Sequence, residues 1–211
     1  MTLETRDTFP TDPAPGADLP PDLAALVGSR LCHDLISPLG AIGNGVELLA
    51  MSGPPSPELA LISESVASAN AKIKFFRIAF GQAGSEQRLG RNEIAGVLAE
   101  ICAGGRLKYR WEVLGDQPRA VVKLVFLALL CLEQALPWGG EIVVSEEDGC
   151  WHLRAETKRT KPDEALWLGL ARGNAQVSPA QVQFALLPRE VAAQGRALTW
   201  EIDETHAEMR F

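Results

Sequence analysis

Two long amphipathic stretches on either side of a proline-rich turn constrain the fold of this 211-residue chain more than any other feature. Residues 52–57 read SGPPSP, and a helix cannot cross them because proline lacks the backbone donor and clashes with the preceding turn. Beyond the turn, Ser56 suits an N-cap and Pro57 a first helical position. Apolar residues then recur alternately three and four positions apart, the spacing of a packed helical bundle: Leu59, Ile62, Val66, Ala69, Ile73, Phe76 and Phe80.

The first stretch predicts a helix from about residue 20–22 to residue 51, and its central part, Arg30–Leu49, reads RLCHDLISPLGAIGNGVELL. On a helical wheel, six aliphatic side chains fall within roughly 40° of one line and should form a buried stripe: Leu31, Leu35, Leu39, Ile42, Val46 and Leu49. His33 lies roughly 160° from Leu35 on the same wheel. The helix should therefore present His33 to solvent, and Pro38 should bend the helix just beyond it.

Two helices joined by a short turn predict an antiparallel hairpin. A lone hairpin buries one side of each helix, and Phe75 and Ile78 add apolar surface outside the expected seam. Two hairpins could together form a four-helix bundle, so we expect a homodimer through residues 22–82. The alternative is that the hairpin packs against a second domain of the same chain.

The rest of the chain predicts a flexible tail over residues 1–21, a hairpin domain over 22–83 and a second domain over 86–211. Apolar periodicity in the second domain favours helices over 91–102, 118–136, 163–172 and 179–194, and strands over 107–113, 141–145, 150–157, 197–202 and 207–211. The fold class expected from this order is α+β, with the helical hairpin followed by an α/β sandwich.

Composition excludes several classes of function. The formal net charge of −7 argues against a nucleic-acid partner. No uninterrupted run of about 18 apolar residues is present, so we expect no membrane span. The first ten residues lack the pattern of a signal peptide, and the four scattered cysteines fit reduced thiols, so a cytoplasmic location is expected.

The segment HDLISPLG, which begins at His33, resembles the phospho-acceptor box of bacterial sensor histidine kinases. The longer segment RLCHDLISPLGAIGNGVELL is more similar to ChpT-type histidine phosphotransferases, and the similarity extends over residues 22–211. The resemblance implies that His33 accepts the phosphoryl group and that Asp34 serves as its basic or orienting partner. Imidazole chemistry agrees, because a neutral ring is a nucleophile and a neighbouring carboxylate can fix its tautomer.

Four further residues are candidate contacts of a docked partner. Ser37 and Asn44 share the helix face of His33. Counting across the turn places Lys74 and Arg77 near the level of His33 on the second helix, where their charges could offset a phosphate. Each of the four could equally be an ordinary solvated surface residue. His152 and His206 fall in predicted strands without ligand-like neighbours, so we expect them to be structural.

The second domain resembles a kinase ATP-binding domain without its nucleotide motifs. The asparagines of such domains fall at Leu130 and Gln134, and although the carbonyl of Gln134 could ligate a metal, Leu130 cannot. The segment AETKRTKPDEALWLGLARG contains no Asp-x-Gly-x-Gly motif, and NAQVSPA before Val182 has no paired glycines to approach phosphates. We therefore expect no ATP and no cofactor in this chain, with Mg²⁺ carried by a partner receiver domain.

These observations favour a histidine phosphotransferase of a two-component phosphorelay. His33 would accept a phosphoryl group from the aspartate of a hybrid kinase's receiver domain and pass it to the aspartate of a response regulator. Two alternatives stay open: a divergent ATP-dependent histidine kinase, and a non-catalytic dimeric adaptor that binds response regulators.

Overall fold

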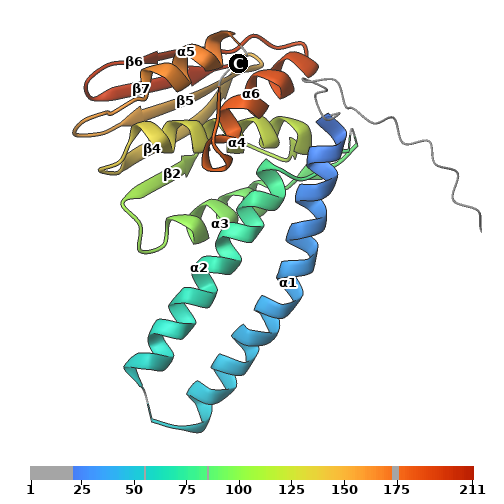
Figure 1. The fold of residues 1–211 in the computed structure, drawn as a ribbon, viewed down its shortest axis with the longest axis vertical. Helices are drawn as coiled ribbons and strands as arrows, with labels where there is room; N and C mark the ends of the chain where they lie inside the picture. Colours follow the sequence, from blue (N-terminus) through green and yellow to red (C-terminus); the bar gives the residue numbers. More distant parts are fainter. Residues whose placement is uncertain (1–20, 55, 85, 173–175) are drawn as a thin grey trace, which may run out of the picture.

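The computed structural model describes residues 21–54, 56–84, 86–172 and 176–211, so the predicted tail lies almost wholly outside the described residues. Helices α1 (Pro21–Ser52) and α2 (Pro57–Ala79) form an antiparallel hairpin that projects from the rest of the molecule (Figure 1). The Ser56 hydroxyl accepts a hydrogen bond from the Leu59 amide at 3.4 Å, so the predicted N-cap is confirmed. Helix α1 continues through Pro38 without a break.

The two helices of the hairpin approach each other through small side chains of α1. A Cβ atom on Gly28 would lie 2.8 Å from the carbonyl oxygen of Phe80, so only glycine fits this crossing. Cys32 and Val46 are buried further along the same side. The Ser29 hydroxyl accepts a hydrogen bond from the Gln82 amide at 2.8 Å, which fixes the end of the hairpin next to the second domain.

Helix α2 covers only part of the predicted stripe on α1, so the single chain does not bury the stripe as the helical wheel predicted. Of its six residues only Val46 is buried and Leu39 is half-buried. The other four are 49–61% exposed in the single chain: Leu31, Leu35, Ile42 and Leu49. A wheel shows which side chains share a face but not what covers them, and here the smaller residues give the closer helix–helix approach.

The seam predicted on α2 is likewise only partly covered. Five of its residues are half-buried, while Ile62 and Phe76 are exposed. The residues that α2 buries fully lie on another side: Ala71, Phe75, Ile78 and Ala79. The Phe75 ring lies 4.5 Å from that of Phe126 in the second domain. Helix α2 therefore packs on α1 with one side and on the second domain with another, as the alternative expectation held.

The second domain is built on a mixed five-stranded sheet with strand order β2-β4-β5-β7-β6, in which β2 and β4 are parallel and all other pairs antiparallel. Its strands are β2 (Leu107–Trp111), β4 (Gly140–Glu147), β5 (Cys150–Glu156), β6 (Thr199–Ile202) and β7 (His206–Arg210). Its helices are α3 (Arg91–Cys102), α4 (Arg119–Ala135), α5 (Glu164–Arg172), the 3₁₀ turn η1 (Pro179–Gln181) and α6 (Gln183–Ala193).

Helices cover one face of this sheet, with the buried helix α4 against it, so the predicted α+β class and the α/β sandwich are confirmed (Figure 1). The side chains that the strands direct toward the helices are apolar and almost fully buried: Ile142, Val144, Leu153, Ala155, Ala207 and Met209. A further two-stranded ladder pairs β1 (Arg88–Leu89) with β3 (Gln117–Pro118). This ladder was not predicted, because two residues are too few to show an alternating pattern.

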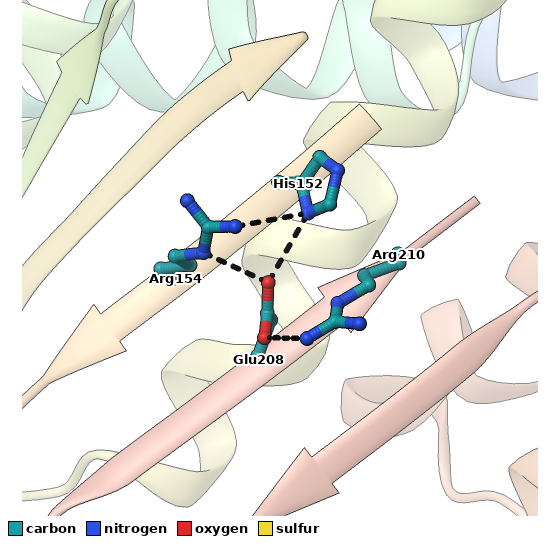
Figure 2. A network of polar contacts seen from close by, with 4 residues as sticks. All are labelled: His152, Arg154, Glu208 and Arg210. Atoms are coloured by element: carbon teal, nitrogen blue, oxygen red, sulfur yellow. Dashed lines mark hydrogen bonds and ion pairs between the residues drawn. The ribbon is translucent and has the colours of Figure 1, made fainter. Parts of the chain in front are cut away.

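The opposite face of the sheet carries a polar network centred on Glu208 (Figure 2). Its carboxylate accepts hydrogen bonds from Arg154 at 2.9 Å and from Arg210, and it lies 3.2 Å from Nδ1 of His152. The hydrogen bond from Arg210, followed by those from His152 and Arg154, lowers the pKa of Glu208 to about 2 although burial opposes the shift. The network joins β5 to β7, which agrees with the structural role expected of His152.

Candidate functional site

His33 lies on α1 with its side chain 85% exposed, as the sequence predicted. The preceding residue, Cys32, points the other way and is buried. Burial raises the pKa of the Cys32 thiol, and the positive charge of Arg77 on α2 opposes this rise. At this level one side of α1 is packed through Cys32, while the imidazole of His33 extends into solvent on the other side.

Asp34 contacts one nitrogen of the imidazole, which leaves the other nitrogen open. Its Oδ1 lies 3.2 Å from Nδ1 of His33, and its Oδ2 accepts a hydrogen bond from Nε of Arg30 at 2.7 Å. The hydrogen bond with His33, and after it that with Arg30, holds the pKa of Asp34 below its usual range. An ionised carboxylate can only accept a hydrogen bond, so this contact favours the tautomer with the proton on Nδ1 and the lone pair on Nε2.

Arg30 was not identified from the sequence, although the signal was present. Arg30 and Asp34 are four residues apart on one helix, the spacing at which opposite charges meet. Ser37 and Asn44 are exposed on α1, as expected for residues that share the face of His33. Since Pro38 has no amide hydrogen, it also frees the backbone carbonyl of Asp34 from its helical hydrogen bond.

The two basic candidates on α2, Lys74 and Arg77, line the same groove. Nζ of Lys74 lies 3.0 and 2.8 Å from the carboxylate oxygens of Glu100 on α3, so its charge is already paired. Arg77 lines a groove of about 390 Å³ together with Ile36 on α1 and Glu93 on α3. The groove, which Lys74 and Glu100 also line, therefore opens beside the helix that carries His33.

The positions at which the resemblance to kinases predicted nucleotide-binding residues lie in the second domain. Leu130 lines a cavity of about 450 Å³ whose walls include Phe75 and Tyr109, and Gln134 is exposed. The segment after β5 crosses the end of α4, where the amide of Lys161 donates to the carbonyl of Ala135 at 2.8 Å.

Helix α5 then buries Trp167, whose ring lies 5.5 Å from that of Phe184 and 5.2 Å from that of Trp200. This segment and α5 thus occupy the part of the chain in which the sequence contains no Asp-x-Gly-x-Gly motif. The segment NAQVSPA falls partly outside the described residues.

No group of three or more His, Cys, Asp or Glu side chains that could hold a metal ion occurs within residues 21–54, 56–84, 86–172 and 176–211. All four cysteines are free thiols. One stretch of α1, Leu23–Ser52, is long and apolar enough to cross a bilayer by length and composition alone, although no span was expected. It lies beside α2 and carries Arg30, His33 and Asp34, so an apolar face for another helix explains the same composition.

Comparisons with known proteins identify phosphotransferases among the proteins that this chain resembles. Over 130 residues the chain is 42% identical to protein phosphotransferase ChpT of Brucella abortus (strain 2308), a match that covers 60% of this chain and 61% of that protein. A solved structure of a bacterial phosphotransferase superposes with a TM-score of 0.63 and 28% identity, over 90% of this chain and 95% of that one. ShkA in complex with AMPPNP shares 15% identity over 88% of this chain and 44% of its own, with a TM-score of 0.48.

The sequence model of the family "Histidine phosphotransferase C-terminal domain" matches residues 91–206, which is more than half of the chain. The matched region includes β2, β4, β5 and β6 and reaches only the first residue of β7, His206. The chain therefore belongs to the histidine phosphotransferase family.

Proposed function

We propose that this protein is a histidine phosphotransferase of a two-component phosphorelay, with His33 as the residue that carries the phosphoryl group. The observation that carries the proposal is the geometry of the imidazole. His33 projects from the helix, its Nδ1 faces an ionised carboxylate, and its Nε2 is open to an approaching partner. Membership of the phosphotransferase family supports the same function.

The transfer step needs little from this chain beyond position and charge. The lone pair on Nε2 attacks the phosphorus of an aspartyl phosphate, a P–N bond forms, and the P–O bond to the aspartate breaks with its electron pair left on the carboxylate. The proton stays on Nδ1, so the ring becomes positively charged and the Asp34 carboxylate stabilises it. The Mg²⁺ that supports this step belongs to the receiver domain.

The proposed partners are receiver domains: that of a hybrid histidine kinase as donor and those of response regulators as acceptors. Exposed Ser37 and Asn44 on the face of His33, with Arg77 in the adjacent groove, are the proposed contact residues, while Lys74 is held by Glu100. We place the protein in the cytoplasm, where receiver domains act.

The exposed stripe of α1 supports a homodimer. Its four large side chains form one apolar face that the described residues leave about half exposed or more: Leu31, Leu35, Ile42 and Leu49. A second hairpin packed on this face would bury it and give a four-helix bundle. His33 lies on the opposite side of α1 and would stay accessible in such a dimer.

Phosphotransfer from a radiolabelled receiver domain tests the function directly. Wild-type protein should acquire label from the phosphorylated receiver and lose it to a second receiver. His33→Ala should acquire none while keeping its circular dichroism spectrum, because the side chain faces solvent. His206→Ala, a half-buried histidine in β7, serves as the matched control and should transfer normally. Failure of the wild-type chain to take up label would leave the adaptor function, and calorimetric binding of micromolar ATP would favour the kinase.

Light scattering after size-exclusion chromatography tests the dimer. Leu35→Asp places a charge on the apolar stripe and should convert the protein to a folded monomer, because an unpaired charge in such an interface costs roughly 3–5 kcal/mol. Leu168→Asp on α5 is the matched control, since Leu168 is 50% exposed and Leu35 is 49% exposed. An unchanged mass for Leu35→Asp would show that the stripe is not the interface.

A further inference from the structure

Two successive contacts, from Arg30 to Asp34 and from Asp34 to His33, bear on the tautomer of the imidazole. Arg30 occupies Oδ2 of Asp34 at 2.7 Å, which directs Oδ1 toward Nδ1 of His33 at 3.2 Å. All three side chains are on the surface: Arg30 is 76% exposed and Asp34 is 47% exposed. An exposed carboxylate on its own would sample several rotamers, so its contact with the ring needs a second anchor.

We infer that Arg30 is a positioning residue for phosphotransfer: by holding Asp34 it keeps the proton of His33 on Nδ1 and the lone pair of Nε2 available for attack. This inference rests on the proposed function, and it adds a residue that neither contacts the phosphoryl group nor belongs to the phospho-acceptor box itself.

The neutral side chain of histidine in water populates both tautomers, and the one with the proton on Nε2 cannot attack through that nitrogen. A carboxylate fixed beside Nδ1 favours the reactive tautomer because it can only accept a hydrogen bond. No other charged residue of α1 contacts this pair in the part of the chain that the structure describes. Arg30 therefore acts through orientation of Asp34.

Arginine suits this position better than other residues. Its guanidinium can reach Asp34 from one helical turn away, and its planar group limits the rotamers of the paired carboxylate. Lysine would restore the charge with a more flexible contact. The positions of Arg30 and Asp34 on one helix also mean that the pair forms whenever α1 is folded, before any partner arrives.

Nitrogen-15 chemical shifts of the imidazole in histidine-labelled protein measure the tautomer without any phosphotransfer. The full-length wild type at a pH where the ring is neutral should show a protonated Nδ1 and an unprotonated Nε2 at His33. Arg30→Ala should move both shifts toward those of free histidine, and Arg30→Lys should restore them in part. Asp34→Asn removes the carboxylate charge and should give the largest change in the two nitrogen shifts of His33.

Transfer rates from a phosphorylated receiver provide the second readout. Arg30→Ala should slow transfer roughly two- to fivefold, the range set by an exposed ion pair. Arg110→Ala is the matched control, because it also removes an exposed arginine paired with a carboxylate, that of Glu112 at 3.2 Å on the sheet. It should change neither the rate nor the His33 shifts.

Unchanged His33 shifts in Arg30→Ala would overturn the inference, and a slower rate with unchanged shifts would mean that Arg30 meets the partner directly. Failure of the proposed function is distinguishable from either result, because wild-type protein would then take up no label whatever its tautomer.

Discussion

Replacement of Phe75 by alanine should destabilise the whole protein, because this side chain joins the hairpin to the second domain. Phe75 is only 1% exposed, and its ring lies 4.5 Å from that of Phe126 and 6.5 Å from that of Tyr109. Burial of such a side chain contributes about 1.5–3 kcal/mol by transfer alone. The cavity left between α2 and α4 raises the expected loss to about 3–5 kcal/mol.

Urea unfolding followed by circular dichroism, at one fixed protein concentration, measures this loss. For a chain of this size the loss corresponds to a fall of roughly 1–2 M in the urea midpoint. Leu114→Ala is the control, because Leu114 is 77% exposed and its truncation should change the midpoint little. A loss below about 1 kcal/mol for Phe75→Ala, less than the transfer term alone, would refute the packing of α2 on the second domain.

Two further predictions concern the second domain. The pKa of Glu208 is lowered from 4.5 to about 2 in the folded protein. The ionised carboxylate therefore stabilises the fold fully at pH values above 4.5, and this contribution is lost as the pH falls through the folded pKa. Glu208→Gln should therefore lose less stability than wild type between pH 4.5 and pH 2 in urea titrations at each pH, and parallel losses would contradict the network. Gly139 has a φ of +89°, and a Cβ there would lie 2.3 Å from the carbonyl oxygen of Arg106, so Gly139→Ala should lower thermal stability by at least about 2 kcal/mol. Gly96→Ala, in the open interior of α3, should instead raise stability by about 0.5–1 kcal/mol, and a loss for Gly96→Ala or a gain for Gly139→Ala would contradict the backbone geometry.

Local signals in the sequence predicted the elements of the fold well. Proline and serine at the start of α2 define its N-terminus, and α3 spans the predicted residues 91–102. Asp148 and Gly149, with φ of 52° and 83°, form the tight turn between β4 and β5, in the gap between the strands predicted over 141–145 and 150–157. Such signals work because each depends on a few neighbouring residues.

The sequence was less informative about which surfaces meet. The periodicity of α1 and α2 identified apolar faces, but the faces that meet within the chain use Gly28 and Cys32, and Phe75 packs on α4. Small residues leave almost no hydrophobic pattern, although they permit the closest helix contact. The same limit applies at the site: the exposure of His33 followed from the wheel, whereas the contact of Arg30 with Asp34 depends on side-chain rotamers.

The junction between the hairpin and the second domain has a kinetic consequence. Beside the buried Phe75, Arg119 donates hydrogen bonds to the carbonyls of Arg77 at 2.8 Å and Gln82 at 3.0 Å, and Lys74 is paired with Glu100. A second domain that supplied the phosphoryl group to His33 of its own chain would have to break these contacts and re-form them in every turnover. Because these contacts hold the second domain in place, the transfer proposed for His33 is bimolecular in both directions, and its rate should scale with the concentrations of the receiver domains.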